Sequence, residues 1–161
     1  MYATIKGVFI IVNILVEKNA NINIQDKDGK TALMYLTNED VYIIAKTLVE
    51  KKADINIRDK DGKTALMYAT IKHLNTIATL LTEGANLNIQ DNNGLTVLMH
   101  AAIVGNYAIA SESIKKGADL NIRDNKDKTA LTYANDNNNF GFEGLLSNND
   151  TEYYEWIIIY I

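Results

Sequence analysis

The sequence predicts an all-α protein, a solenoid of stacked helical repeats, and three observations support this fold class. Residues 26–35 and 59–68 share the same ten letters, DKDGKTALMY. Two weaker copies follow, DNNGLTVLM at 91–99 and DNKDKTAL at 124–131. The threonines of the four copies lie 33, 32 and 33 residues apart. A fixed period of this length is typical of a unit that cannot bury its apolar face alone and therefore stacks on its neighbours.

Each unit begins with a turn and a short helix. Asp26 and Gly29 stand at the first and fourth positions of a type I turn, and Thr31 follows where a helix N-cap belongs. The helical period then places Leu33 on the inward face and Tyr35 on the outward face. This helix spans only about two turns, so it needs neighbouring repeats for its stability.

A second amphipathic helix completes the unit. In the first full copy it covers residues 41–51, with Ile44 and Leu48 in its apolar stripe. Gly84 and Gly117 follow the same helix in later copies, where we expect them to be left-handed C-caps. The 32-residue spacing predicts a one-residue deletion near His73.

Ahead of each turn stands a second motif: NANINIQ, KADINIR, GANLNIQ and GADLNIR. Together, the motifs and their order resemble the ankyrin repeat. The resemblance covers residues 1 to about 147. It implies a domain with repeats at 1–25 (partial), 26–58, 59–90, 91–123 and 124–147 (degenerate), followed by a tail at 148–161. The sequence departs from the family where Thr-Ala-Leu-Met replaces Thr-Pro-Leu-His, which predicts a stability below that of a consensus array.

The first residues, MYATIK at 1–6, recur at 67–72. We therefore expect the chain to begin inside the first helix of a repeat, with Gly7 between two helices as Gly105 is later. The run from Gly7 to Val16 also has the apolar character of a secretory signal, but Lys18 spoils the cleavage site. We prefer the repeat register and expect a cytoplasmic protein, while secretion without a conventional signal stays open.

The C-terminal part differs from the rest in charge. The net charge of the chain is −4, which argues against a general nucleic-acid binder. No Lys or Arg follows Lys128, whereas five acidic residues do: Asp136, Glu143, Asp150, Glu152 and Glu155. The last residues, YYEWIIIYI at 153–161, are too few to span a bilayer and are prone to β-aggregation. We interpret them first as a lid over the last repeat. A sticky or disordered end and a membrane or partner contact are the alternatives.

No motif for catalysis, a cofactor or a metal stands out. The chain has no cysteine, which excludes thiolate metal sites and cysteine nucleophiles. An EF-hand alignment of Asp26 and Asp28 would put Ile24 and Tyr35 at positions that need oxygen ligands, so turn chemistry explains these acids better. The two histidines, His73 and His100, do not occupy equivalent repeat positions.

One surface is a candidate for partner binding. The outward position of the short helix carries one residue per repeat: Tyr2, Tyr35, Tyr68, His100 and Tyr133. Neighbouring apolar candidates are Ile71, Leu95, Ile103 and Val104, and the turns add Lys27, Lys30, Lys60 and Lys63. Aromatic residues on an outward face favour a contact patch. The alternative is that each ring packs on the next repeat, and the charged turns are a solvated edge.

The resemblance implies non-catalytic protein–protein recognition through the concave groove and the turns. The alternatives are a remnant of a longer array without a dedicated partner and, less favoured, a small enzyme with no recognisable motif. We expect a protein partner, no nucleic acid, no membrane and no cofactor, and a monomer unless the tail self-associates. The resemblance also raises hydroxylation of Asn56, Asn88 and Asn121, although a structural role in holding the next loop is the simpler interpretation.

Overall fold

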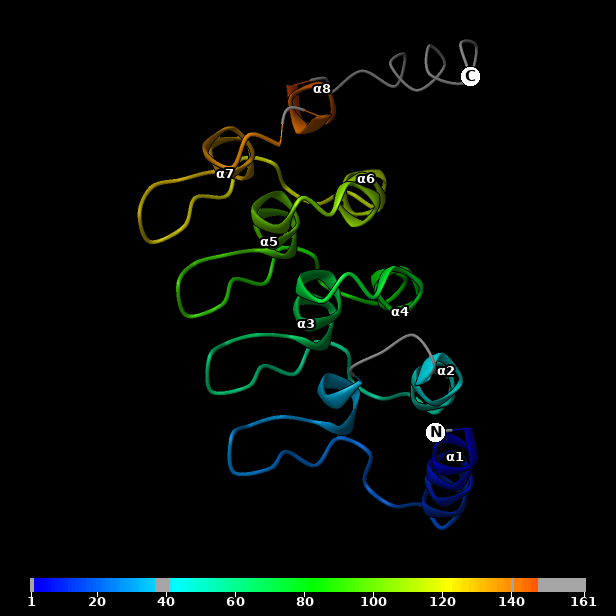
Figure 1. Ribbon diagram of the computed structural model, residues 1–161. Helices are drawn as coiled ribbons and strands as arrows, with labels where there is room; N and C mark the ends of the chain where they lie inside the picture. Colours follow the sequence, from blue (N-terminus) through cyan, green and yellow to red (C-terminus); the bar gives the residue numbers. More distant parts are fainter. Residues whose placement is uncertain (1, 37–40, 140, 148–161) are drawn as a thin grey trace, which may run out of the picture.

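The computed structural model describes residues 2–36, 41–139 and 141–147 as a stack of helical layers (Figure 1). These residues form helices and no strand, which confirms the predicted all-α solenoid. In chain order the helices are α1 (Tyr2–Glu17), the 3₁₀ turn η1 (Ala32–Tyr35), α2 (Tyr42–Glu50), α3 (Ala65–Ile71), α4 (Asn75–Thr82), α5 (Val97–Val104), α6 (Tyr107–Lys115), α7 (Ala130–Asp136) and α8 (Gly141–Ser147).

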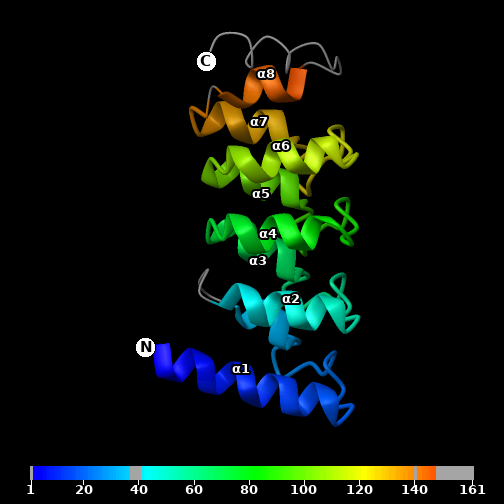
Figure 2. The same ribbon diagram turned by 90° about the vertical axis from the view of Figure 1, so that its right-hand side faces the viewer.

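The helices form two rows. Helices α3, α5 and α7 follow one another in an inner row beside the loops, which project to the left in Figure 1. Helices α1, α2, α4 and α6 form the outer row that faces the viewer in Figure 2. In the described part of the chain, no inner helix lies on the N-terminal side of η1, because α1 stacks below α2 in the outer row.

The core fills the space between the two rows. Leu66 and Leu98 from the inner row meet Ile77 and Ile109 from the outer row, and all four are almost fully buried. Fully buried alanines allow the helices to approach closely: Ala45, Ala78, Ala101, Ala102, Ala110 and Ala134. Ser113 is buried among them with an unpaired hydroxyl, which is a local weakness of the fourth unit.

Threonine caps begin the later inner helices. Thr64 accepts a hydrogen bond from the Met67 N–H, and Thr96 accepts one from Met99. Thr129 forms a capping box with Thr132. The predicted threonine cap is absent from the first full unit. There the Thr31 side chain makes no capping hydrogen bond, and only the 3₁₀ turn η1 forms.

The expected break at Gly7 is also wrong. Helix α1 runs without interruption over 16 residues, so the YATI residues, whose second copy ends α3 in the third unit, begin an outer helix here. A glycine inside a helix costs about 1 kcal/mol relative to alanine. One continuous helix keeps the backbone hydrogen bonds that a break would lose, and this offsets the cost.

The one-residue deletion that shortens the third unit lies at the end of α4 rather than near His73, where the sequence predicts it. His73, Gly105 and Asn138 all take left-handed conformations at the equivalent junction, with φ of 55°, 71° and 57°. Helix α4 has 8 residues, whereas α2 and α6 have 9. The shorter α4 ends without a left-handed residue, so the C-cap prediction holds for Gly117, with φ of 85°, and fails for Gly84.

Candidate functional site

The four turn tips, residues 26–30, 59–63, 91–95 and 124–128, share one hydrogen-bond pattern. The first aspartate of each tip accepts, through Oδ1, the backbone N–H groups two and four residues ahead. The distances lie between 2.8 and 3.0 Å at Asp26, Asp59, Asp91 and Asp124. A short carboxylate side chain that bonds its own backbone stabilises a tight turn, which explains the aspartate at this place.

The second carboxylate oxygen of each aspartate holds the aromatic residue nine positions ahead. The Tyr68 hydroxyl donates to Asp59 Oδ2 at 2.6 Å, and Tyr133 donates to Asp124 Oδ2 at 2.5 Å. Tyr35 donates to Asp26 in the same way, and His100 Nε2 lies 2.9 Å from Asp91 Oδ2. We call each of these four pairs a tip clamp, because it fastens the turn tip to the inner row.

The tip clamps change how the row of predicted outward residues, one per repeat, is interpreted. Its residues lie one per repeat along the inner row, but their polar ends bond within their own unit. Tyr35 is 52% exposed and Tyr68 and Tyr133 are half-buried, so their rings still reach the surface. His100 is only 6% exposed, so the expected outward ring is wrong at that position. The side chain of Tyr2 lies outside the described residues.

Hydrogen bonding and burial shift the pKa values of the tip clamps. The hydrogen bond from Tyr35 lowers the pKa of Asp26 and raises the pKa of Tyr35 itself. The bond to Asp124, together with burial, raises the pKa of Tyr133 to about 12. Burial lowers the pKa of His100, and the carboxylate of Asp91 opposes that shift without reversing it. Near neutral pH the tyrosines therefore stay protonated donors.

Lysines from the tips lie along the aromatic rings. Lys30 Nζ is 4.8 Å from the ring centroid of Tyr68 in the next unit and 5.8 Å from that of Tyr35. Lys63 Nζ lies 3.7 Å from the exposed carboxylate of Asp61. Lys27 and Lys60 are exposed at the outer end of the tips. Of the four predicted lysines, Lys30 thus lies beside two rings and Lys63 beside an acid.

The four apolar candidates are half-buried: Ile71, Leu95, Ile103 and Val104. Leu95 ends the third tip and packs against the core, while the other three stand at the C-terminal ends of α3 and α5. Ile71, Ile103 and Val104 thus lie on the same inner row as Tyr68, and all four candidates have part of their side chain in solvent.

Hydrogen bonds between successive tips make the surface continuous. The N–H groups of Lys60, Asn92 and Asn125 donate to the carbonyl of the preceding tip at 3.0, 2.9 and 3.1 Å. A Cβ on Gly94 would lie 2.7 Å from the Asn125 nitrogen, so only glycine fits there. Asp127 takes the equivalent place in the last tip with φ of 62°, where the described residues include no further tip to collide with.

Asparagines behind the tips tie the repeats together. Asn23, Asn56 and Asn88 each accept, through Oδ1, a backbone N–H of the following unit at 2.7 to 2.9 Å. This pattern agrees with the structural interpretation of Asn56 and Asn88. Sequence reasoning assigned the aspartates to the turns but missed their hydrogen bonds to the aromatic residues, although the constant spacing of nine residues between the two was visible.

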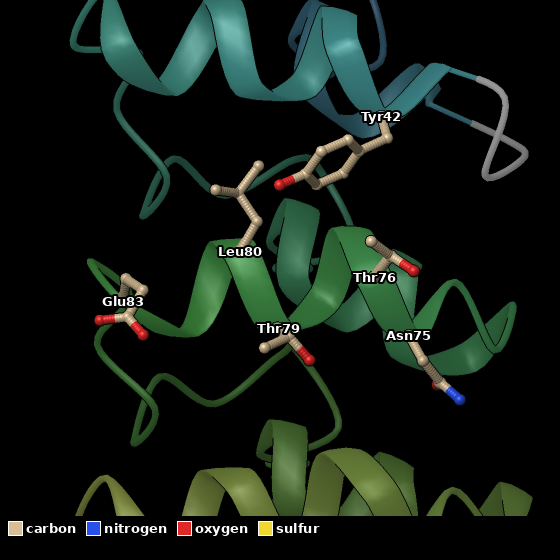
Figure 3. A pocket seen from close by; sticks show the side chains of 6 residues that line it. All are labelled: Tyr42, Asn75, Thr76, Thr79, Leu80 and Glu83. Carbon is tan, nitrogen blue, oxygen red and sulfur yellow. The ribbon is translucent and has the colours of Figure 1, made fainter.

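A shallow cleft of about 440 Å³ lies on the opposite, outer side between α2 and α4 (Figure 3). Tyr42 reaches down from α2 toward Leu80 of α4, and Thr76, Thr79 and Glu83 line the lower wall. The lining combines hydroxyl, carboxylate and apolar groups without a cluster of reactive side chains. In the described part of the chain, no group of three His, Cys, Asp or Glu residues could hold a metal ion.

Comparison with known families agrees with this architecture. The family model described as ankyrin repeats (3 copies) matches residues 1–91 and again residues 72–154. The chain belongs to the ankyrin-repeat family. Members of this family are generally non-catalytic and mediate protein–protein interactions. A search of curated proteins found no match for this ankyrin-repeat chain. None of the described helices is both long and apolar enough to cross a membrane.

Proposed function

We propose that this ankyrin-repeat chain binds another protein through the surface formed by the turn tips and the inner row of helices. The observation that carries the proposal is the set of half-exposed rings that are already fixed in place. Tyr68 is held at its hydroxyl by Asp59 and covered on its ring by the Lys30 ammonium group. A ring that is immobile before binding loses little conformational entropy when a partner covers it.

The surroundings of the rings suit a contact surface. Ile71 and Ile103 add apolar area at the ends of α3 and α5, and the exposed lysines and aspartates of the tips form a polar rim. Apolar and aromatic anchors inside a polar rim are the usual anatomy of a protein interface. The buried ring of His100 contributes through the shape of the third tip rather than by contact.

The test compares two surfaces of the same chain. The inner-surface variant carries Tyr35→Ala, Ile71→Asp and Ile103→Asp. Tyr35 is exposed, and the two isoleucines are half-buried. The matched outer variant carries Ile43→Asp and Thr79→Asp, both at exposed positions on α2 and α4. Circular dichroism first establishes that both variants keep the native helix content.

Native chain and both variants then serve as baits in lysate of the source cell, with mass spectrometry of the bound proteins. We expect a partner that the native chain and the outer variant retain and that the inner-surface variant loses at least tenfold. Equal capture by the two variants, or no protein above background on the native chain, would contradict the proposal.

A further inference from the structure

Among the described residues, one face of α1 carries exposed apolar side chains. Four of its residues are about half-exposed: Ile10 at 49%, Ile11 at 58%, Ile14 at 51% and Leu15 at 51%. Ile24, in the loop that follows, is 65% exposed. Exposed apolar side chains gathered on one helix face mark a surface that contacts another chain or segment. We call these five residues the α1 face.

A small apolar cavity continues the α1 face toward the first tip. It has a volume of about 170 Å³ and is lined mainly by aliphatic side chains, among them Val12, Leu15, Ile22 and Ile24. A second, polar cleft of about 340 Å³ adjoins it, with Lys51 and Lys52 in its lining. The α1 face is therefore an apolar strip with lysines at one border.

The chain itself carries a segment of matching chemistry. Residues 153–161, YYEWIIIYI, lie outside the described residues, and their sequence is aromatic and aliphatic apart from Glu155. Glu152 and Asp150 precede them, and no basic residue follows Lys128. Apolar side chains that match the strip and acids that match Lys51 and Lys52 make this segment complementary to the α1 face in both respects.

The segment as a whole cannot lie along the α1 face of its own chain. Helix α8 ends at Ser147 at one end of the stack, and α1 lies at the other end (Figure 2). Going from α8 to α1 along the outer side crosses four helix contacts, through α6, α4 and α2. At a spacing of about 8–10 Å between packed helices, α8 and α1 lie about 32–40 Å apart. Residues 148–152 span at most about 18 Å when fully extended. A segment 153–161 that lies on α1 must then belong to a second copy.

We propose that residues 153–161 of one copy bind the α1 face of a second copy, so that chains associate head to tail. Such an interface is heterologous, because each copy contributes a different surface to its two neighbours. It does not depend on the binding surface proposed above, which lies on the inner row. The native chain should therefore show an apparent mass that rises with concentration above 18.0 kDa.

A complementation experiment with full-length chains tests the proposal. The face variant carries Ile11→Asp and Ile14→Asp, and the tail variant carries Trp156→Asp and Ile158→Asp. Ile43→Asp is the matched control, because Ile43 is 53% exposed but lies on α2 outside the α1 face. Sedimentation velocity measures the mass of each chain over a hundredfold range of concentration.

We expect each variant alone to stay at 18.0 kDa, and the control to associate like the native chain. An equimolar mixture of the two variants should form a species of twice that mass, because the intact segment of one meets the intact face of the other. Trp156 is the only tryptophan, so its emission in the face variant should shift to the blue when the tail variant is added.

Three results would overturn the proposal. A native chain that stays monomeric at every concentration has no such interface. A tail variant that still associates points to pairing of two α1 faces. A mixture that stays monomeric, with a tail variant that unfolds at lower temperature than the native chain, points to a lid on its own last repeat.

Discussion

Residues 26–35 and 59–68 have the same sequence and different structures. Both segments form the same turn, and both tyrosines bond the first aspartate of their tip. The second copy continues into the α-helix α3 with a threonine cap, whereas the first forms only the 3₁₀ turn η1 without one. Tyr35 is exposed and Tyr68 is half-buried. Ten identical residues therefore determine the turn but not the helix behind it.

The neighbours of the two segments explain the difference. Helix α3 lies in the inner row between η1 and α5, while η1 has an inner helix on one side alone within the described residues. A helix of two turns gains little from its own hydrogen bonds and depends on packing. With packing on one side, the first copy keeps the locally stabilised turn and forms less of the helix.

The largest difference between the copies should come from the core leucines. We expect Leu66→Ala to lower the free energy of unfolding by about 3–4 kcal/mol and Leu33→Ala by about 2 kcal/mol, although both side chains are buried. The Leu66→Ala substitution leaves a cavity between packed units, while the first full unit can relax around Leu33. Urea unfolding followed by circular dichroism measures both. Equal losses would mean that the first full unit is as tightly packed as the third.

The tip glycines should show the next largest effect. A Cβ at Gly62, where φ is 79°, would lie 2.7 Å from the Asn92 nitrogen of the next tip. We expect Gly62→Ala to cost about 2–3 kcal/mol in unfolding free energy, from left-handed strain and the clash together.

The last tip supplies the control for this substitution. Asp127→Ala changes the equivalent residue where no described tip follows, and we expect a loss of less than about 1 kcal/mol. A similar loss in both variants, measured by thermal unfolding, would contradict the role of tip stacking.

A smaller effect is expected at the caps. Thr64→Ala removes the hydrogen bond to the Met67 N–H and should cost about 1 kcal/mol. Thr31→Ala changes the equivalent position of the first full unit, where no capping hydrogen bond exists. Its cost in unfolding free energy should therefore be smaller than that of Thr64→Ala. The amide hydrogen exchange rates of Met67 and Met34 measure the protection of the first turn of α3 and of η1. A larger loss from Thr31→Ala would show that η1 is stabilised by its threonine after all.

The fourth unit differs from the third in using His100 where Tyr68 stands. Burial, together with the charge of Lys63, holds the pKa of His100 below its ordinary value, against the opposing effect of Asp91. The unfolded chain therefore binds a proton more readily than the folded chain. The stability contributed by neutral His100 is complete above about pH 6.5 and falls as the pH drops toward the folded-state pKa.

His100→Tyr should remove this part of the pH dependence and replace the histidine of this tip clamp with the tyrosine that the other units use. The measurement is the difference in unfolding free energy between native and variant chains from pH 7.5 to pH 5. We expect the native chain to lose more stability over this range. Parallel pH profiles would show that His100 does not titrate with folding.

Much of the molecule could be predicted without coordinates. The period determined the solenoid, and aspartate and glycine at fixed places determined the first three tips, because turns depend on residues that are close in sequence. The threonine caps of α3, α5 and α7 follow from the same local chemistry. The candidate surface could be placed on the inner row, because one aromatic residue recurs in each unit.

Tertiary structure alone decided the rest. The residues YATI end the inner helix α3 at 68–71 and begin the outer helix α1 at 2–5, and His100 is buried where Tyr35 is exposed. These differences depend on which units pack on either side of each segment. The repeat pattern of the sequence could not predict them, because it is the same for every repeat. Local sequence thus specifies the unit and its tip, while stacking governs how much of each helix forms and which rings reach solvent.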